Sequence, residues 1–354
     1  MLTGTPQRNT TEGSLLADDR FLRKVAYLYY ADGQTQEDIA TMLYCSRQTI
    51  GKALQKARDR NIVHISVVPE ERTGYLRNLS RDLRFTLGLE DLVLVPGRNG
   101  KKMSVYDVVE DVVAEITMTA ADYLDQLITN EDVLAVSGGR TLMRNVVRYL
   151  KPTKLLPNLE VVPTIGFVET RTSSGDSNLI AYDIATAYGA KHSWLPIPAI
   201  VETPEQREQA RGLPLVRDVC KTMEKATIVM MGIWPAHISN LDLVKRKVLS
   251  QLQVEALQTF QPVGDINHWV FDAPGQCINE ILAPPPYYLT GLEIPRLKER
   301  IKKEKIKVIL VAGASPAYVP AIQAALRAGI VNILISDHVT AELLKAGLDE
   351  ATQK

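Results

Sequence analysis

The stretch Thr35–Asn61, TQEDIATMLYCSRQTIGKALQKARDRN, decides the fold of the N-terminal part of the chain because it predicts two short helices joined by a turn. Thr35 stands where a helix N-cap is expected, and Asp38 three residues later offers a weaker form of the capping box. Apolar residues then recur at helical spacing: Ile39, Ala40 and Leu43. This pattern predicts the first helix.

The second helix is predicted to begin after Ser46, another suitable N-cap residue. Its inner face carries Ile50, Ala53, Leu54 and Ala57 at intervals of three and four residues. Its outer face is basic and polar, as in the second helix of a helix-turn-helix, which reaches base edges and phosphates from the major groove. The alternative is a small helical bundle with a solvated basic face. The predicted DNA-binding residues are Thr35, Gln36, Ser46, Arg47, Gln48, Thr49, Lys52, Lys56 and Arg58.

Charge is concentrated locally rather than over the whole chain. The 354 residues have a formal net charge of zero, yet five cations and one acidic residue lie between Ser46 and Asn61. A basic module on a neutral body suits sequence-specific binding, since strong charge everywhere favours non-specific binding. The three cysteines are far apart and not in metal-ligand spacing, and no signal peptide or bilayer-length apolar run is evident. We therefore expect a soluble cytoplasmic protein with no membrane partner, no metal and no cofactor.

The flanking segments complete the predicted N-terminal domain, residues 20–69. Residues 1–19 are polar and are expected to form a flexible tail. A further helix is predicted from Phe21 to Gly33, and the β-branched run Ile62–Val68 predicts a short strand, or wing, ended by Pro69. The polar residues 70–74 are the predicted hinge.

Residues 75–354 predict one open, doubly wound α/β sheet. Buried strands alternate with helices from residue 75 to the C-terminus, which is typical of a parallel sheet whose ligands bind at the carboxyl ends of the strands. Helices are predicted at residues 75–87, 105–128 and 178–188, and from about residues 141 and 319. The predicted strands are Leu92–Val95, Val133–Val136, Leu159–Pro163, His192–Ile197, Thr227–Gly232, Lys307–Gly313 and Val331–Ser336.

Unusual residues collect at those carboxyl ends. Ser137, Gly138, Gly139, Arg140 and Thr141 form a turn at a helix N-terminus, where backbone N–H groups and the Arg140 cation suit an anion. The alternative is that a tight strand-to-helix turn simply needs the glycines. The stretch Ala312–Ala317, AGASPA, predicts a second such turn. The predicted effector-binding residues are Ser137, Gly138, Gly139, Arg140, Thr141, Thr164, Gly166, Asn178, Gly232, Asp265, Gly313, Ala314 and Ser315.

Three further features each allow two interpretations. The polar stretch Thr170–Asn178 either closes over a ligand or is a mobile surface loop. Trp234 either stacks on a ligand or belongs to the core. In GDINHWVFDAPG, Asp265 and Asp272 form either a carboxylate pair or parts of a hairpin in which Asp272 starts a turn through Gly275. Asp265 is the better ligand candidate, since it follows Gly264 in a polar loop.

No catalytic constellation is evident. The histidines are scattered, and HExxH, GxSxG and a Walker lysine are all missing from the sequence. The run Arg296–Lys307 alternates charge signs and predicts a solvated helix face. No residue is therefore assigned a catalytic role.

The chain resembles the SorC/DeoR-type (sugar-binding) bacterial transcriptional regulators over nearly its whole length after the tail. The resemblance rests on YYADGQTQEDIATMLYCSRQTIGKALQKARDRNIVHISV, VLVPG, VLAVSGGRTLMRNVV, GDINHWVFDAPG and VILVAGASPAYVPAIQAALRAGIVNILISDHVTAELL. It implies an effector domain similar in fold to sugar-phosphate isomerases that binds a sugar or phosphosugar without turnover. It also implies oligomers, often tetramers, on paired operator half-sites.

By motif, the resemblance makes residues 138–141 the anion or sugar turn, Asp265 a hydroxyl acceptor, and Gly313 with Ser315 the second turn. Family members commonly carry a lysine just after this second turn, whereas this chain reads GASPAYVPAI. That departure puts a phosphate group in question, although Arg140 offers a substitute cation.

The sequence therefore predicts a transcriptional regulator that binds double-stranded operator DNA, senses a sugar, polyol or phosphosugar and forms a homodimer or homotetramer. One alternative is a sugar-phosphate isomerase-like enzyme with an appended DNA-binding module. The other is an interaction protein whose helical head binds protein.

Overall fold

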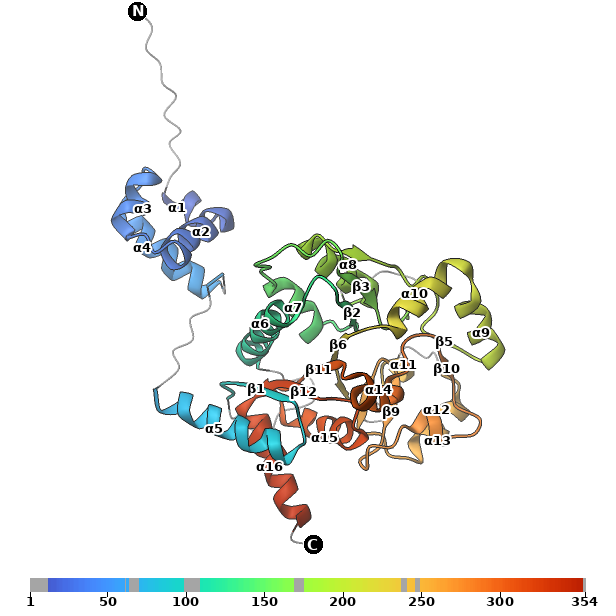
Figure 1. Cartoon of the computed structure of the whole chain (residues 1–354). Coiled ribbons are helices and arrows are strands. Elements are labelled where there is room, and N and C mark those ends of the chain that lie inside the picture. Colours follow the sequence, from blue (N-terminus) through green and yellow to red (C-terminus); the bar gives the residue numbers. More distant parts are fainter. Residues whose placement is uncertain are drawn as a thin grey trace, which may run out of the picture. The chain divides into compact units, whose positions relative to one another are not determined.

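The computed structural model describes residues 12–60, 62–63, 70–98, 109–168, 175–236, 241–245 and 249–352. The chain divides into two compact units, Met1–Pro69 and Glu70–Lys354 (Figure 1). Each unit has its own hydrophobic core, so each is described by itself.

The first unit is a small helical module. Its helices are α1 (Glu12–Leu15), α2 (Asp19–Ala26), the π-helical turn η1 (Tyr27–Ala31), α3 (Gln36–Met42) and α4 (Arg47–Asp59). The capping box of Thr35 and Asp38 is confirmed, and the Ser46 hydroxyl accepts from the Thr49 N–H at 3.0 Å as the N-cap of α4. Leu22, Ile39 and Ile50 are fully buried, which confirms the predicted apolar stripes.

The ends of this module differ in part from the sequence-based prediction. Leu16, placed in the predicted tail, is buried in the core of the module, directly after α1. Residues 1–11 of that tail lie outside the described residues. Of the predicted wing, only Ile62 and Val63 are described, and they form a bend that packs against the core.

The second unit is organised around a seven-stranded sheet with the order β1-β12-β11-β6-β2-β3-β4, in which every described pair is parallel. All five residues of β12 are buried, and so are four of the five in β11, which requires cover on both faces of the sheet. The strands are β1 (Asp91–Val95), β2 (Val133–Val136), β3 (Glu160–Pro163), β4 (Lys191–His192), β6 (Ile228–Gly232), β11 (Lys307–Val311) and β12 (Ile333–Asp337).

Helix α7 contacts both α6 and α8, and all three pack on the sheet. Helix α10 packs on β2 and β3, and α14 packs on β11 (Figure 1). The helices are α5 (Glu70–Thr86), α6 (Glu110–Leu127), α7 (Leu142–Tyr149), α8 (Ser177–Tyr188), α9 (Pro204–Gly212), α10 (Pro214–Glu224), α11 (Asp242–Lys245), α12 (Gln251–Gln258), α13 (Ile278–Ile281), η3 (Ile294–Arg296), α14 (Leu297–Glu304), η4 (Pro316–Tyr318), α15 (Val319–Ala328) and α16 (His338–Thr352). The predicted doubly wound α/β class is confirmed.

Two small antiparallel sheets supplement the main one. One pairs β5 (Ile200–Val201) with β10 (Tyr288–Leu289), and the other joins β7 (Trp234–Pro235), β8 (Gly264–Ile266) and β9 (Trp269–Phe271). The sequence predicted neither the first pair nor the third strand of the second sheet. Their residues pack with a separate apolar cluster, which includes Val270, Tyr287 and Leu289.

Several predicted boundaries shift. The strand expected at His192–Ile197 is reduced to β4, whose last residue is His192, since Pro196 and Pro198 lack the N–H group that a ladder needs. Helix α5 begins at Glu70, so residues 70–74, expected to be a hinge, belong to its first turns. The helix expected from Val105 starts at Glu110 within the described residues.

Candidate functional site

The first half of α4 presents an exposed polar face. Arg47, Gln48 and Lys52 are exposed, and Arg47 forms a long, solvent-exposed ion pair with Glu37, at 3.8 Å. Such exposed pairs contribute about 0–1 kcal/mol, so the Arg47 guanidinium exchanges partners at little cost. This face of α4 has the chemistry of a recognition helix.

Thr49 does not lie on that face, contrary to the sequence-based expectation. Its residue is 5% exposed and its hydroxyl lies 2.8 Å from the Ser46 hydroxyl. The reason is helical geometry, because position 49 shares a helix face with the fully buried Ala53 and Ala57. Thr49 therefore supports the N-cap rather than the outer surface.

The remaining predicted DNA-binding residues are partly committed to contacts within the module. Lys56 Nζ donates to the Leu16 carbonyl at 3.5 Å, and Arg58 donates to Gln55 at 2.6 Å. The Thr35 hydroxyl donates to the Asp38 carboxylate at 2.6 Å, within the capping box. Gln36 is half-buried with its side-chain oxygen beside Gly51. Lys56 and Arg58 are therefore exposed but also bonded within the module.

The turn between α3 and α4 carries two exposed apolar side chains that the sequence-based list omitted. Tyr44 is 97% exposed and adopts a positive φ of 52°, and Met42 is 48% exposed. A left-handed tyrosine in a tight turn holds its ring away from the core. The ring lies in the same turn from which α4 starts, so it adjoins the candidate DNA face.

In the second unit, the first glycine turn follows β2 and opens α7. Gly139 has a φ of 151°, and its N–H donates to the Gly175 carbonyl at 2.9 Å. A Cβ on Gly138 would come within 2.7 Å of that carbonyl oxygen, so the two segments cross too closely for any side chain. Thr141 caps α7 without a side-chain hydrogen bond, and Arg140 is exposed beside it. The first N–H groups of α7 lack partners within the helix and therefore suit an anion.

A hydroxyl network links this turn to the ends of the neighbouring strands. The Ser137 hydroxyl accepts from the Gly232 N–H at 3.1 Å, which joins the ends of β2 and β6. The hydroxyls of Thr164 and Ser177 both donate to the Val136 carbonyl, at 3.1 and 2.8 Å. Sequence reasoning missed Ser177, although its position one residue before Asn178 put it in the stretch already singled out.

The hairpin β8–β9 brings a second polar group to the same place. Asn267 Nδ2 donates to the Thr164 hydroxyl at 2.8 Å, and the Asp265 carboxylate accepts from the His268 N–H at 2.7 Å. Asn267 and His268 have φ values of 52° and 65°, so they form the tight turn of the hairpin. Sequence reasoning also missed Asn267; the signal was its place two residues after Asp265, in the two-residue turn that follows β8.

Asp265 lies in an enclosed environment. The residue is 7% exposed, and its second carboxylate oxygen lies 3.7 Å from His268 Nδ1. Tyr287 donates from its hydroxyl to the His268 carbonyl at 2.7 Å, and burial, with the nearby Asp265 charge, raises the pKa of Tyr287. Tyr287 is therefore a neutral hydrogen-bond donor beside a carboxylate acceptor.

Asp272 plays a structural role, as the hairpin interpretation predicted. Its carbonyl accepts from the Gly275 N–H at 3.0 Å and its carboxylate accepts from the Gln276 N–H at 2.7 Å. Trp234 is half-buried in β7, paired with Asp265 across the sheet.

The second glycine turn, after β11, differs from the first. Gly313 and Ala314 have φ values of 138° and 65°, and the Ala314 N–H donates to the Asp337 carboxylate at 2.7 Å. The buried Ser315 hydroxyl accepts from the Ala317 N–H at 3.4 Å. An acidic side chain thus occupies a donor that was expected to face an effector.

Two other predicted effector residues point into the protein body. The Asn178 side-chain oxygen accepts from the Leu195 N–H at 2.7 Å in a buried position. A Cβ on Gly166 would overlap the Ile197 carbonyl, so Gly166 permits a close crossing of two segments. Residues 170–174 of the predicted loop Thr170–Asn178 lie outside the described residues.

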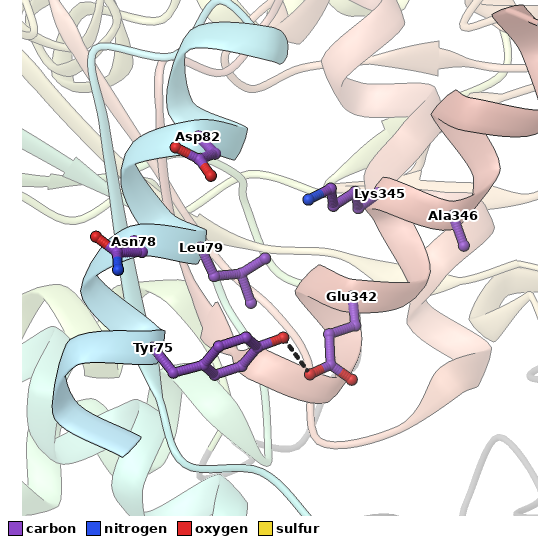
Figure 2. A pocket seen from close by; sticks show the side chains of 7 residues that line it. All are labelled: Tyr75, Asn78, Leu79, Asp82, Glu342, Lys345 and Ala346. Atoms are coloured by element: carbon purple, nitrogen blue, oxygen red, sulfur yellow. Dashed lines mark hydrogen bonds between the residues drawn. The ribbon is translucent and has the colours of Figure 1, made fainter. Parts of the chain in front are cut away.

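The polar cluster is defined as Ser137, Thr164, Ser177, Asp265 and Asn267. A groove of about 330 Å³ lies between α5 and α16, helices that contribute none of these residues (Figure 2). It is lined by Tyr75, Asn78, Leu79, Asp82, Glu342, Lys345 and Ala346. The Tyr75 hydroxyl donates to Glu342 at 2.8 Å across it. Among the helices within the described ranges, none is long and apolar enough to cross a bilayer.

Comparisons with known proteins cover most of the chain. The family model "putative sugar-binding domain" matches residues 72–345. The uncharacterized transcriptional regulator YjhU of Escherichia coli strain K12 is 26% identical over 342 residues, covering 96% of this chain and 98% of that protein. The deoxyribonucleoside regulator of Bacillus subtilis strain 168 is 26% identical over 325 residues, covering 91% of this chain and 96% of that protein.

Solved structures share the fold. The full-length sorbitol operon regulator SorC from Klebsiella pneumoniae superposes with a TM-score of 0.62 at 22% identity, covering 92% of this chain and 98% of that one. A probable sor operon regulator from Shigella flexneri gives a TM-score of 0.62 at 23% identity over 76% of this chain and 99% of that one.

Proposed function

The chain belongs to the putative sugar-binding domain family of transcriptional regulators, and we propose that it binds operator DNA with an affinity controlled by a sugar, polyol or phosphosugar. The observation that carries this proposal is the placing of Ser137, Thr164 and the Asp265 hairpin beside the first glycine turn at one edge of the sheet. Hydroxyl, amide and carboxylate groups in one partly enclosed place match a ligand rich in hydroxyl groups.

The DNA-binding part of the proposal is supported by α4. Arg47 and Gln48 lie in its first turn and Lys52 lies one turn later, all exposed, while the opposite face is buried in the module core. Arginine and glutamine side chains are suited to bidentate contacts with base edges in the major groove. Lys52 suits a phosphate contact.

The effector part is supported by a division of chemistry within the polar cluster. Asp265 accepts hydrogen bonds and suits ligand hydroxyl groups, whereas Arg140 and the N-terminus of α7 suit an anion. A phosphorylated sugar would use both ends, and a neutral sugar or polyol only the first. Because the segment just after the second glycine turn, GASPAYVPAI, contains no lysine, Arg140 is the cation expected at the phosphate end.

We further propose that the protein binds this effector without turnover, works in the cytoplasm and acts as a homodimer or homotetramer. The oligomer is supported by the small size of the exposed α4 face, because a single recognition helix of 13 residues holds DNA weakly. Two or more copies would engage paired half-sites.

A thermal-shift screen tests the effector part. The panel is ribose, glucose and sorbitol, each with and without a terminal phosphate. A compound that binds only the folded state at 100 times its Kd adds about 2.7 kcal/mol of stability, so the Tm must rise. No shift with any panel compound, or turnover of one of them, contradicts the proposal.

Binding to duplex DNA, measured at a fixed salt concentration, tests the DNA-binding part of the proposal. Arg47→Ala should weaken specific binding by about 1–3 kcal/mol if Arg47 contacts a base. Arg60→Ala is the matched control, because Arg60 follows α4 and instead pairs with Asp19 at 2.6 Å. Equal affinities of wild type and Arg47→Ala would remove Arg47 from the interface.

A further inference from the structure

A short segment, residues 289–293, lies between the polar cluster and the surface helix α9 and is called the strap. It leads from β10 to η3. Its inner side is fixed to the sheet edge, because the Leu292 N–H donates to the Thr164 carbonyl at 2.7 Å. A Cβ on Gly291 would overlap the same carbonyl oxygen. The strap therefore backs directly onto Thr164.

The strap also holds the hairpin that carries Asp265. Trp269 Nε1 donates to the Leu292 carbonyl at 3.0 Å, in the strand that follows Asn267 and His268. Asn267, in the turn of the same hairpin, donates to the Thr164 hydroxyl, so the strap contacts Thr164 directly and, through Trp269, the hairpin that bonds to it. A shift of the strap would change the spacing of Thr164 and Asn267.

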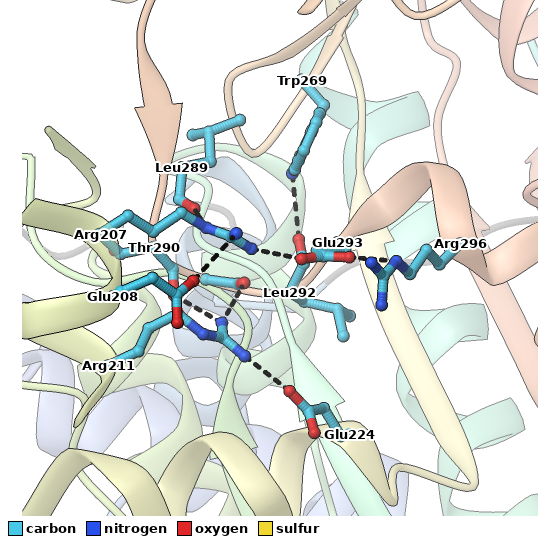
Figure 3. A network of polar contacts seen from close by, with 11 residues as sticks. Arg207, Glu208, Arg211, Glu224, Trp269, Leu289, Thr290, Leu292, Glu293 and Arg296 are labelled. Atoms are coloured by element: carbon cyan, nitrogen blue, oxygen red, sulfur yellow. Dashed lines mark hydrogen bonds and ion pairs between the residues drawn. The ribbon is translucent and has the colours of Figure 1, made fainter. Parts of the chain in front are cut away.

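Two arginines of α9 hold the outer side of the strap (Figure 3). Arg207 Nε donates to the Leu289 carbonyl at 2.8 Å, and its guanidinium also pairs with Glu293. Arg211 Nη1 donates to the carbonyls of Thr290 and Gly291 at 2.9 and 3.0 Å. Three consecutive carbonyls of the strap are thus bound by two guanidinium groups.

These arginines are enclosed, although the helix that carries them is not. Their side chains are 21% and 15% exposed, whereas α9 has no buried residue among its nine. Arg211 is oriented by Glu224 of α10, with Nη2 to carboxylate oxygen at 2.6 Å. Charged hydrogen bonds in a partly enclosed place are stronger and more directional than exposed ones. The contact between α9 and the strap is therefore specific and polar rather than apolar.

We propose that Arg207 and Arg211 are positioning residues of the effector site: by fixing the strap against Thr164 and Trp269, they set the affinity for a hydroxyl-rich ligand. The inference rests on the proposed function, because it requires that the polar cluster bind such a ligand. Neither arginine needs to touch the ligand.

Arg211→Ala and Arg207→Ala in the full chain test this role, with Arg217→Ala as the control, since Arg217 is an exposed arginine on the adjacent helix α10. The first measurement is hydrogen–deuterium exchange without ligand. Peptides that contain the amides of Leu292 and Thr164 should exchange at least tenfold faster in Arg211→Ala, while peptides from β1 and the control variant stay as in wild type. Unchanged exchange in the strap overturns the proposal.

The second measurement is a Kd. The ligand is the panel compound that most raises the wild-type Tm, and the Kd is calculated from the concentration of folded protein at a temperature where all variants are folded. Both arginine variants should raise this Kd at least tenfold. Arg211→Lys should recover only part of the affinity, because an ammonium group cannot bond two carbonyls and Glu224 in one plane. Faster strap exchange with an unchanged Kd would show a merely structural role and overturn the proposal. If the wild type binds no panel compound, the proposed function itself fails. The exchange measurement, which needs no ligand, separates that outcome from a failure of the arginines to hold the strap.

Discussion

The two glycine turns at the carboxyl edge of the sheet look alike in sequence but use their backbone donors differently. After β2, Gly138 and Gly139 lead into α7, whose cap residue makes no side-chain hydrogen bond, with Arg140 beside it. After β11, the equivalent donor of Ala314 is taken by the Asp337 carboxylate. In the first turn the Gly139 N–H donates to the Gly175 carbonyl beside an exposed arginine, whereas in the second turn a buried carboxylate accepts the bond.

The difference comes from the neighbouring strand and from prolines. Asp337, the last residue of β12, also accepts from the Thr340 N–H at 3.0 Å and from its hydroxyl at 2.7 Å, so all its contacts are internal. Pro316 and Pro320 lie in the first turns of η4 and α15 and supply no N–H groups. A glycine turn therefore indicates an anion site only when nothing in the protein already satisfies its donors.

The largest effect is expected for Asp337→Ala. This change removes three hydrogen bonds to a 2% exposed carboxylate and leaves the Ala314 and Thr340 donors buried without partners. We expect the free energy of unfolding to fall by about 3–5 kcal/mol, measured by urea denaturation. Asp218→Ala, at an exposed position of α10, should change it by less than about 0.5 kcal/mol. A loss below about 1 kcal/mol for Asp337→Ala would remove the contrast between the turns.

Arg140→Ala should show the opposite behaviour at the first turn. Since Arg140 is exposed, stability should change by less than about 0.5 kcal/mol. The Kd for a phosphorylated panel compound should rise by about 10–100-fold, which corresponds to the loss of one charged hydrogen bond of about 1.5–3 kcal/mol. Isothermal titration with the matched unphosphorylated compound is the control and should be unchanged. Equal losses for both compounds would show that Arg140 does not meet the phosphate.

The smallest effect concerns Asp125, a buried carboxylate of α6 away from both turns. It accepts from the hydroxyls of Thr153 and Tyr188 at 2.6 and 2.9 Å. Burial alone raises the pKa of Asp125, but these hydrogen bonds outweigh it, so the net pKa is lowered. A lowered folded-state pKa adds stability above the unfolded value of about 3.9, and this stability is lost as pH falls through the folded pKa.

The free energy of unfolding of the wild type should therefore fall as the pH drops below about 4. Asp125→Asn should make this total fall smaller by about 1 kcal/mol. Chemical denaturation at several pH values between about 3 and 7 measures it. A variant curve parallel to the wild-type curve would mean that the charge of Asp125 does not stabilise the folded protein.

Sequence reasoning predicted the parts of the fold that depend on local pattern. The caps at Thr35 and Ser46 were correct because N-capping needs only a suitable side chain near its own helix. The central strands were also predicted within a few residues, since a continuous apolar run such as β11 is buried on both faces. The small sheets were missed because β5 and β10 are two residues each and pair across a long separation in sequence.

The candidate site was predicted only in outline because its chemistry depends on partners distant in sequence. Asn178 bonds Leu195, and Ala314 bonds Asp337, and neither pair can be deduced from spacing. Asn267 reaches Thr164 only through the hairpin turn. Pro316 and Pro320, which supply no N–H group, were visible in the sequence, but the prediction of a second turn like the first did not use them.

The central claim is that occupancy of the polar cluster changes affinity for DNA. The most direct measurement is fluorescence anisotropy of a duplex selected from a random pool by the full chain, titrated with and without the panel compound that raises the Tm. Coupled sites of this kind differ by about 5–150-fold in affinity, so the Kd for the duplex should shift by at least about fivefold. The Arg140→Ala or Arg211→Ala chain should need more compound for the same shift. A duplex Kd that stays constant while the compound demonstrably binds would contradict the account.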